Sequence, residues 1–147
     1  MFIEGMLPAA RDRLMTIGHD APLIDAAKLL SSAQVNLVVV CDSSDALAGV
    51  ITRTDVVRQI SHCAGSSCAT AVESVMTRDV TCCRPGDLLT DVWSTMRERG
   101  LKHVPVIDKS FRPLGVLYAR DALQVLLGEV EYEELLLRDY VMGVGYR

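Results

Sequence analysis

The sequence repeats itself at a fixed spacing of 66 residues. The stretch "GVITRTDVV", residues 49–57, returns as "GVLYARDAL", residues 115–123. Without a gap, the pattern of apolar and polar residues in 14–60 agrees with that in 80–126 almost throughout. Agreement over such a length predicts that the chain folds as two copies of one supersecondary unit.

Each copy predicts the same order of elements: strand, helix, strand, strand, helix. A short β-prone segment, "RLMTI" or "DVTCC", leads through a turn into the first helix. Two segments rich in β-branched residues then predict a hairpin, and the last helix is expected to begin at Asp55 or Asp121. The unbroken run "LVVV" is typical of a strand covered on both faces by helices. We therefore expect an α+β fold in which the two sheets bury against one another.

Apolar residues at helical spacing predict the first helix of each copy. They are Leu23, Ala26, Ala27 and Leu30 in the first copy and Leu88, Leu89, Val92 and Met96 in the second. Asp20 is expected to cap the first of these helices, and Asp87 is expected in the first turn of the other. Gly100 is expected to end the second helix, because glycine is common directly after a helix.

The composition excludes several classes of protein. Half of the residues are hydrophobic and the mean hydropathy is +0.25, which argues against disorder. A net charge of −4 and a pI near 5.3 give no electrostatic reason to expect nucleic acid as the main partner. The apolar runs are shorter than the roughly 18 residues that a membrane-spanning helix needs, and the N-terminus lacks a secretory signal pattern. We therefore expect no membrane span and a cytoplasmic location.

The cysteines and histidines show no disulfide or metal-binding pattern. The five cysteines are Cys41, Cys63, Cys68, Cys82 and Cys83, an odd number at irregular spacing that suits a reducing compartment. In "SHCAGSSCAT", oxidation or metal binding with His62 is an alternative to a simple connector. No metal is predicted, and the chain is not predicted to be an enzyme, because it contains no nucleophile, phosphate-loop or zinc-protease motif.

The order of elements, the duplication and the segment "KHVPVID…PLGVLYARD" together resemble a tandem pair of CBS domains, the cystathionine-β-synthase-type repeat. The resemblance implies a pseudo-twofold disc with two clefts between the copies, in a stand-alone regulatory protein rather than a catalyst. The expected boundaries are 10–62 for the first repeat, 63–71 for a linker, 72–128 for the second repeat and 129–147 for a helical tail.

The resemblance also implies an adenine nucleotide in the clefts, with AMP expected first and ATP, ADP, NAD(H) or S-adenosylmethionine as alternatives. In the first cleft, strand alternation places Thr52 and Thr54 on one side while Arg53 points away. A carboxylate at the start of a helix, Asp55, is a natural acceptor for ribose hydroxyls, and the free amides of that helix end suit a phosphate. The alternative is that Thr52 merely favours a strand and Asp55 merely caps a helix.

Residues of the second copy are expected to complete the first cleft. They are Thr81, Leu101, Lys102, His103 and Val104. Aliphatic side chains and backbone amides would hold the adenine, and Lys102 and His103 would face phosphate. The alternative for these two residues is an exposed connection between a helix and a strand, where basic residues are common.

The second cleft departs from this pattern. Tyr118 and Arg120 replace the two threonines, whereas Asp121 is retained. The residues expected opposite are Met15, Thr16, Val35, Asn36 and Leu37, none of which is a cation that matches Lys102. Tyr118 is expected to fill space or stack on a base, and Arg120 to supply the positive charge. Two sites of unequal affinity follow, with the Asp55 site preferred.

The expected partners are a nucleotide, a second copy of the chain in a homodimer and an unknown regulated protein. The competing interpretation is a structural or interaction module with empty clefts, or a redox-responsive one that acts through its cysteines. The tail is predicted to be helical up to about Met142. Three adjacent leucines, 135–137, indicate that more than one face of this helix becomes buried, on the disc, in a dimer or on a partner.

Overall fold

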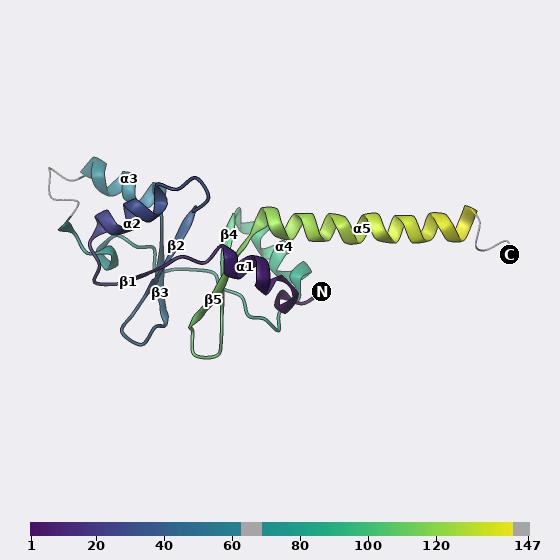
Figure 1. Ribbon diagram of the computed structural model, residues 1–147, viewed down its shortest axis with the longest axis horizontal. Helices are drawn as coiled ribbons and strands as arrows, with labels where there is room; N and C mark the ends of the chain where they lie inside the picture. The colour runs from purple at the N-terminus through teal and green to yellow at the C-terminus, as the bar shows by residue number, and fades with distance from the viewer. Residues whose placement is uncertain (63–68, 143–147) are drawn as a thin grey trace.

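The computed structural model describes residues 1–62 and 69–142, apart from the side chain of residue 62 and several side chains in 130–142. The elements in chain order are η1 (Ile3–Met6), α1 (Leu7–Asp12), β1 (Thr16–Gly18), α2 (Leu23–Leu30), β2 (Leu37–Cys41), β3 (Leu47–Thr52), α3 (Arg53–His62), η3 (Val72–Ser74), α4 (Leu89–Arg99), β4 (His103–Ile107), β5 (Pro113–Tyr118) and α5 (Ala119–Met142). Figure 1 shows the first copy, with β1–β3, beside the second copy, with β4 and β5. The predicted duplication and both hairpins are confirmed.

The two sheets differ in their first strand. In copy one, β1 pairs in parallel with β2, which pairs antiparallel with β3. In copy two the predicted strand "DVTCC" is wrong: among the described residues it contributes only an isolated bridge from Cys83 to Val106. The cause is Pro105, which stands where copy one has Val39. The N–H of Val39 donates to the Met15 carbonyl at 2.8 Å, and proline has no N–H to make this bond.

The sheets pack face to face, with helices on the outside. Val38 and Val40 of β2 belong to a core formed with α2 and α3, whereas Leu37 and Val39 face the other sheet and pack with Tyr118. The prediction that helices cover both faces of this strand is therefore wrong on one face, because the other sheet covers it. The α+β fold class and the burial of the two sheets against each other are confirmed.

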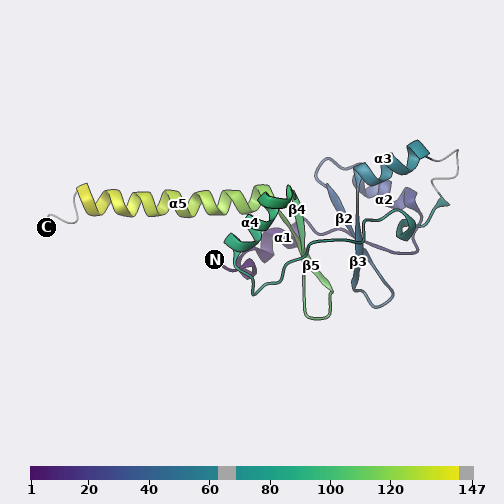
Figure 2. The same cartoon turned by 180° about the vertical axis from the view of Figure 1, so that it is seen from behind.

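The segment that leads into each copy packs on the other copy. Ile3, Met6 and Ala10 of η1 and α1 lie in the core of copy two, and Figures 1 and 2 both show α1 beside β5. In the same way Val72 and Met76, ahead of copy two, lie in the core of copy one. Since Met6 and Ala10 precede Val72 and Met76 by 66 positions, the duplication extends further upstream than the pattern in 14–60 indicates.

Close backbone contacts hold these leading segments, residues 1–13 ahead of copy one and 70–79 ahead of copy two, in place. A Cβ added at Gly115 would lie 2.6 Å from the carbonyl carbon of Ala10, and one added at Gly49 would lie 2.6 Å from the carbonyl oxygen of Thr77. Both positions therefore require glycine, because a side chain there would collide with backbone. Because the leading segments are held in this way, the residues that directly follow them have fixed positions in the clefts.

The leading segments also cap the helices. The N–H of Leu23, the first residue of α2, donates to the Thr70 carbonyl at 2.7 Å, and the N–H of Leu89 donates to the Met1 carbonyl at 2.9 Å. The predicted roles of Asp20 and Asp87 in these helices are therefore wrong, since both residues precede the helix and distant carbonyls satisfy its first amide.

The predicted ends of two helices are confirmed. Gly100 ends α4 with a φ of 66°, a left-handed conformation that favours glycine. Helix α5 runs without a break from copy two to Met142 and projects well beyond the disc (Figure 1). Leu137 is 65% exposed, while the side chains of residues 135 and 136 lie outside the described set. Within 1–62 and 69–142, no helix combines the length and apolar character needed to cross a membrane.

Candidate functional site

The first cleft is a cavity of about 680 Å³ between the two copies. It brings together seven of the residues that the sequence assigns to it: Thr52, Thr54, Asp55, Thr81, Leu101, Lys102 and His103. Val104 is the exception, because alternation along β4 turns it into the core, where it is 1% exposed, and its neighbour Pro105 lines the cleft instead. The threonines reach the cleft although α3 already begins at Arg53, so strand alternation is not the reason for their common side.

The cleft also contains residues that sequence reasoning misses. They are Val50, Arg58, Thr77, Asp79, Val80, Gly100 and Pro105, together with Leu37, which the sequence assigns to the second cleft. Arg58 follows Asp55 by three positions on α3, with its Nη1 3.7 Å from Asp55 Oδ1, so helical spacing is a sufficient signal for it. Thr77 and Asp79 belong to the segment that leads into copy two. This segment packs on copy one, and no local pattern in the sequence predicts that packing.

Asp55 is 7% exposed and forms a reciprocal cap with Thr52 at the start of α3. The N–H and the hydroxyl of Thr52 donate to Asp55 Oδ2 at 3.0 and 3.2 Å, and the N–H of Asp55 donates to the Thr52 hydroxyl oxygen at 3.4 Å. Asp55 therefore takes part in capping α3, for which Thr52 is the N-cap residue. Asp55 Oδ1 has longer contacts, 3.4 Å to the Thr77 hydroxyl and 3.7 Å to Arg58, and so retains capacity as an acceptor.

Arg53 points away from the cleft, as the sequence predicts, and ties the end of α2 to the start of β2. Its Nε donates to the Leu30 carbonyl at 2.9 Å, its Nη2 to the Ser32 carbonyl at 2.6 Å and its Nη1 to Asn36 Oδ1 at 2.8 Å. Three hydrogen bonds from one guanidinium hold the connection between α2 and β2 in place. This connection forms one wall of the second cleft.

The copy-two side of the first cleft is basic. Lys102 is exposed, and burial, together with the nearby Lys102 charge, lowers the pKa of His103 below its ordinary value. The His103 ring makes an edge contact with the Tyr118 ring, at 4.7 Å between centroids. Arg99 donates from Nη1 to the Thr81 hydroxyl at 3.0 Å, which brings another cation to this side. An anionic group is the natural complement of such a wall.

The second cleft differs in its centre. Arg13 donates from Nε to Asp121 Oδ2 and from Nη2 to Asp121 Oδ1, both at 3.1 Å. Its guanidinium carbon lies 4.5 Å from the centroid of the Tyr118 ring, and the Tyr118 hydroxyl accepts a hydrogen bond from the N–H of Asn36 at 3.3 Å. The sequence names Arg120 as the source of positive charge in this cleft, whereas in the structure Arg13, from the end of α1, is the cation that pairs with Asp121.

The open part of the second cleft is a cavity of about 430 Å³. It is lined by Ala9, Asp12, Arg13, Met15, Ser32, Gln34 and Val35, of which the sequence predicts Met15 and Val35. Thr16 is exposed on β1, and Leu37 turns toward the first cleft because of its position in β2. Arg120 is also exposed and is not the residue that pairs with Asp121.

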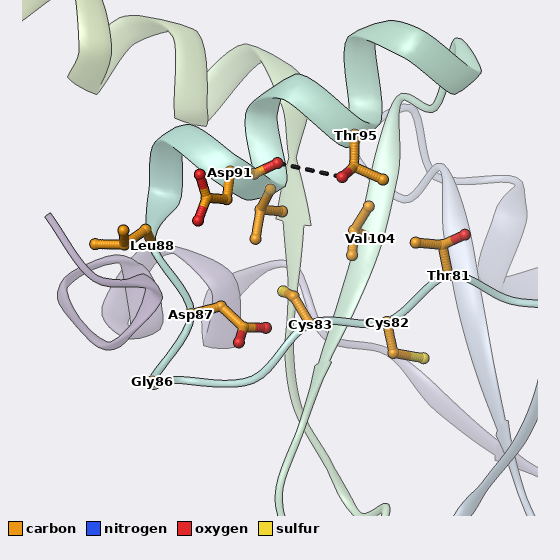
Figure 3. Close-up of a pocket in the computed structure, with 10 residues that line it drawn as sticks. Thr81, Cys82, Cys83, Gly86, Asp87, Leu88, Asp91, Thr95 and Val104 are labelled. Carbon is orange, nitrogen blue, oxygen red and sulfur yellow. Dashed lines mark hydrogen bonds between the residues drawn. The ribbon is translucent and has the colours of Figure 1, made fainter.

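A further cavity, of about 360 Å³, lies within copy two between α4 and the segment 81–88 (Figure 3). Figure 3 shows the sulfur atoms of Cys82 and Cys83 pointing in different directions from this segment. Burial raises the pKa of both thiols, that of Cys83 to about 12, so neither is a ready nucleophile. No cluster of metal-ligating side chains occurs among the residues that the structure describes, and residues 63–68, with Cys63 and Cys68, lie outside them.

Two repeats packed face to face around two clefts match a known protein family. The family model for the CBS domain matches residues 8–62 and again residues 72–128. The chain belongs to the CBS domain family. The resemblance seen in the sequence is thereby confirmed, and CBS-domain pairs are in general regulatory modules that often bind adenosine-containing ligands.

Solved structures share the fold across most of the chain. The CBS-domain containing protein ATU1752 of Agrobacterium tumefaciens is 25% identical, with a TM-score of 0.72 over 85% of this chain and 98% of that one. The AcuB protein of Vibrio cholerae, named for acetoin utilization, is 22% identical, with a TM-score of 0.77 over 91% and 96%. The CBS domain pair of protein MJ0100, 23% identical with a TM-score of 0.67 over 82% and 96%, was solved in complex with 5′-methylthioadenosine and S-adenosyl-L-methionine.

Curated relatives contain the same unit in proteins of different length. A 17.7 kDa protein of Acidianus ambivalens is 27% identical over 118 residues, which are 80% of this chain and 70% of that protein. A homoserine O-acetyltransferase of Methanosphaera stadtmanae is 28% identical over 101 residues, 69% of this chain but only 20% of the enzyme. Since the chain spans a fifth of that enzyme, the similarity concerns its CBS-type portion and carries no acetyltransferase activity to this chain.

Proposed function

We propose that this CBS-domain protein is a regulatory module that binds an adenine nucleotide in its first cleft and thereby changes its association with a partner in trans. The observation that carries the proposal is the cavity of about 680 Å³ in which Thr52, Thr54 and Asp55 of copy one face Lys102 and His103 of copy two. Its volume is in the ordinary range for small-ligand sites. Hydroxyls and a carboxylate suit a ribose, while the Lys102 cation and the imidazole N–H of His103 suit a phosphate.

AMP is the first ligand that we propose, with ADP, ATP, NAD(H) and S-adenosylmethionine as alternatives. The adenosine part is supported by the ligands of the MJ0100 domain pair, both of which contain adenosine. The phosphate part is supported by Arg58 and Lys102, which line the cleft from opposite copies. S-adenosylmethionine would bring a sulfonium cation toward these two side chains, which is unfavourable unless Asp55 or Asp79 compensates it.

Regulation requires that the ligand distinguish between two arrangements of the protein. Because the first cleft takes residues from both copies, a nucleotide there would favour one relative packing of the copies over another. We propose that this packing controls binding to a partner protein and that the module works as a homodimer in the cytoplasm.

Isothermal titration calorimetry with AMP, ADP, ATP, NADH and S-adenosylmethionine tests the proposal. In Asp55→Asn we expect AMP affinity to fall by at least about tenfold, because a hydrogen bond to a charged acceptor contributes about 1.5–3 kcal/mol. Lys102→Ala should weaken AMP more than adenosine, since it removes a charge that only the phosphate meets. Asp121→Asn is the matched control and should leave this binding event intact.

Two outcomes would contradict the proposal. One is the absence of binding by all five ligands up to low millimolar concentration. The other is an AMP site that responds to Asp121→Asn and not to Asp55→Asn. Since Asp55 also caps α3, circular dichroism and thermal melts must first show that Asp55→Asn is folded; Lys102→Ala gives a second readout that leaves the cap unchanged.

The competing redox interpretation gains no support from the described cysteines. Burial raises the pKa of Cys41, Cys82 and Cys83, and a protonated thiol is a poor target for oxidation. A binding curve for AMP that is unchanged by a reductant would separate the nucleotide proposal from the redox alternative.

A further inference from the structure

The carboxylate of the second cleft already has an occupant. Both oxygens of Asp121 accept hydrogen bonds of 3.1 Å from the Arg13 guanidinium, in a bidentate pair. The two side chains are 25% and 15% exposed. Each oxygen keeps a second lone pair, but the guanidinium lies across the side of the carboxylate that it faces. A ribose diol that approaches Asp121 from this side would therefore have to displace Arg13.

Tyr118 and its neighbours hold the guanidinium in position. The guanidinium carbon lies 4.5 Å from the Tyr118 ring centroid, a cation–π geometry, and the Tyr118 side chain is 3% exposed. The hydroxyl of the same ring accepts from the backbone of Asn36. The ring therefore occupies the position that Thr52 has in the first cleft, and it stacks on Arg13 rather than leaving a face for a base.

The duplication shows that this arrangement is particular to the second cleft. The position that follows Arg13 by 66 residues is Asp79, which is exposed and lines the first cleft. Equivalent positions therefore carry opposite charges, and only the Arg13 charge is complementary to the aspartate in its own cleft. Asp55, equivalent to Asp121, has as its nearest cation Arg58 at 3.7 Å, which is 64% exposed on its side chain.

The fold itself delivers Arg13 to this position. Arg13 directly follows α1, whose Ala10 packs against the backbone of β5 at Gly115. Helix α1 is anchored further by Met6, which lies in the core of copy two. The backbone of Arg13 is thus held in place, and because its planar guanidinium makes two hydrogen bonds at once, less side-chain freedom is lost for each bond to Asp121.

We infer that Arg13 blocks the carboxylate of the second cleft from within, so that this chain offers one ligand site where its duplicated fold provides two, although a cavity of about 430 Å³ remains beside Arg13. The inference rests on the proposed function only for the choice of AMP and adenosine as probes. Arg13 acts here as a specificity-determining residue: it excludes a ligand from Asp121 and leaves the cleft of Asp55 as the site that can be occupied.

Calorimetry of the full chain tests the inference through the number of ligands bound. With AMP, and with adenosine as a probe that has the diol but no phosphate, wild type should bind about one equivalent. Arg13→Gln removes the charge that occupies Asp121 and should raise this to about two equivalents. In Arg13→Gln with Asp121→Asn the additional event should disappear. Arg11→Gln, the same change of charge two residues earlier on α1, is the matched control and should stay at wild-type stoichiometry.

The result that overturns the inference is a folded Arg13→Gln variant that binds no more of either probe than wild type. A second overturning result is a wild type with two binding events, one of which Asp121→Asn removes. If wild type binds neither probe but Arg13→Gln binds one in a manner that depends on Asp121, the proposed function fails and the blocking of Asp121 stands. Thermal melts of each variant establish folding independently of any ligand.

Discussion

The two clefts of this molecule place an aspartate at equivalent positions, but a different group binds the aspartate in each. Both place an aspartate in the first turn of the helix that follows the hairpin, Asp55 in one and Asp121 in the other. In the first cleft the aspartate caps its own helix through Thr52; in the second it pairs with Arg13, 108 positions away in the sequence. The difference teaches that duplication preserves the scaffold, while the residue carried in by the leading segment determines whether the aspartate of the cleft is accessible to a ligand.

The first helix of each copy also ends in a different way. In copy two, Gly100 ends α4 with a left-handed residue. In copy one the equivalent position is Gln34, which lies beyond the end of α2 at Leu30, and the guanidinium of Arg53 instead binds the carbonyls of Leu30 and Ser32. The wall of the second cleft therefore depends on a side chain, whereas the wall of the first depends on the backbone.

The largest effect is expected where a leading segment contacts a strand. Gly115→Ala places a Cβ 2.6 Å from the Ala10 backbone and should destabilise the fold by about 1–3 kcal/mol, because α1 has to shift. The shift should also pull Arg13 away from Asp121. Gly49→Ala meets the Thr77 carbonyl oxygen at 2.6 Å and should disturb the first cleft instead. Urea unfolding and AMP titration of both variants measure these effects.

Gly128→Ala is the control for these two substitutions. Nothing lies within 4 Å of a Cβ added at this position of α5, so the change should be neutral or stabilise the helix by up to about 1 kcal/mol. Equal stability of Gly115→Ala, Gly49→Ala and Gly128→Ala would show that the leading segments are not held by these contacts. Loss of AMP binding in Gly115→Ala alone would reverse the assignment of the two clefts.

The pH dependence of binding should distinguish the clefts next. Burial and Lys102 lower the pKa of His103, which lines only the first cleft, so its ring is neutral near pH 7 in the free protein. A bound phosphate would favour the protonated ring. AMP affinity should therefore rise several-fold as the pH falls from about 8 toward about 6, the second pKa of a phosphate monoester, with uptake of protons.

Calorimetry in buffers of different ionisation enthalpy measures this proton uptake. His103→Gln should remove most of the pH dependence while the protein keeps binding adenosine. A wild-type affinity that does not vary between pH 6 and 8, or an equal slope in His103→Gln, would place the phosphate away from His103. The Tyr118 ring, which contacts His103 at 4.7 Å between centroids, would in that case have no link to the ligand.

The sequence predicts the parts of this structure that follow from local patterns. The apolar spacing of α2 and the β-branched character of the hairpin segments can each be recognised within a short stretch of sequence. The repeat distance of 66 then pairs Asp55 with Asp121. Seven of the fifteen residues that line the first cleft are among those that the family resemblance places there, at the ends of these elements. These predictions succeed because periodicity and turn chemistry are properties of neighbouring residues.

The missed features depend on contacts between distant segments. The pairing of Arg13 with Asp121 leaves no periodic signal, and neither does the return of Val72 to the core of copy one. Pro105 is visible in the sequence, but the N–H that it removes matters only once the register of copy one shows that Val39 donates at this position. The lost strand of copy two can thus be explained from the structure but not predicted from the residue alone.

The smallest effect concerns an ion pair that only the first half of the molecule has. Nδ1 of His19, in the turn after β1, lies 2.8 Å from Oε2 of Glu73 in η3; the positions 66 residues away from them, Pro85 and Leu7, cannot ionise. The hydrogen bond to Glu73 raises the pKa of His19 in the folded state. A raised folded-state pKa means that the stabilisation is fully present below the unfolded value of about 6.5 and is lost as the pH rises through the raised value.

The difference in urea midpoint between wild type and His19→Gln should therefore be larger at pH 6 than at pH 8.5, and Glu73→Gln should reproduce it. Because both side chains are partly exposed, the difference should be small; a difference that grows with pH would mean that His19 stabilises the leading segment of copy two as a neutral ring.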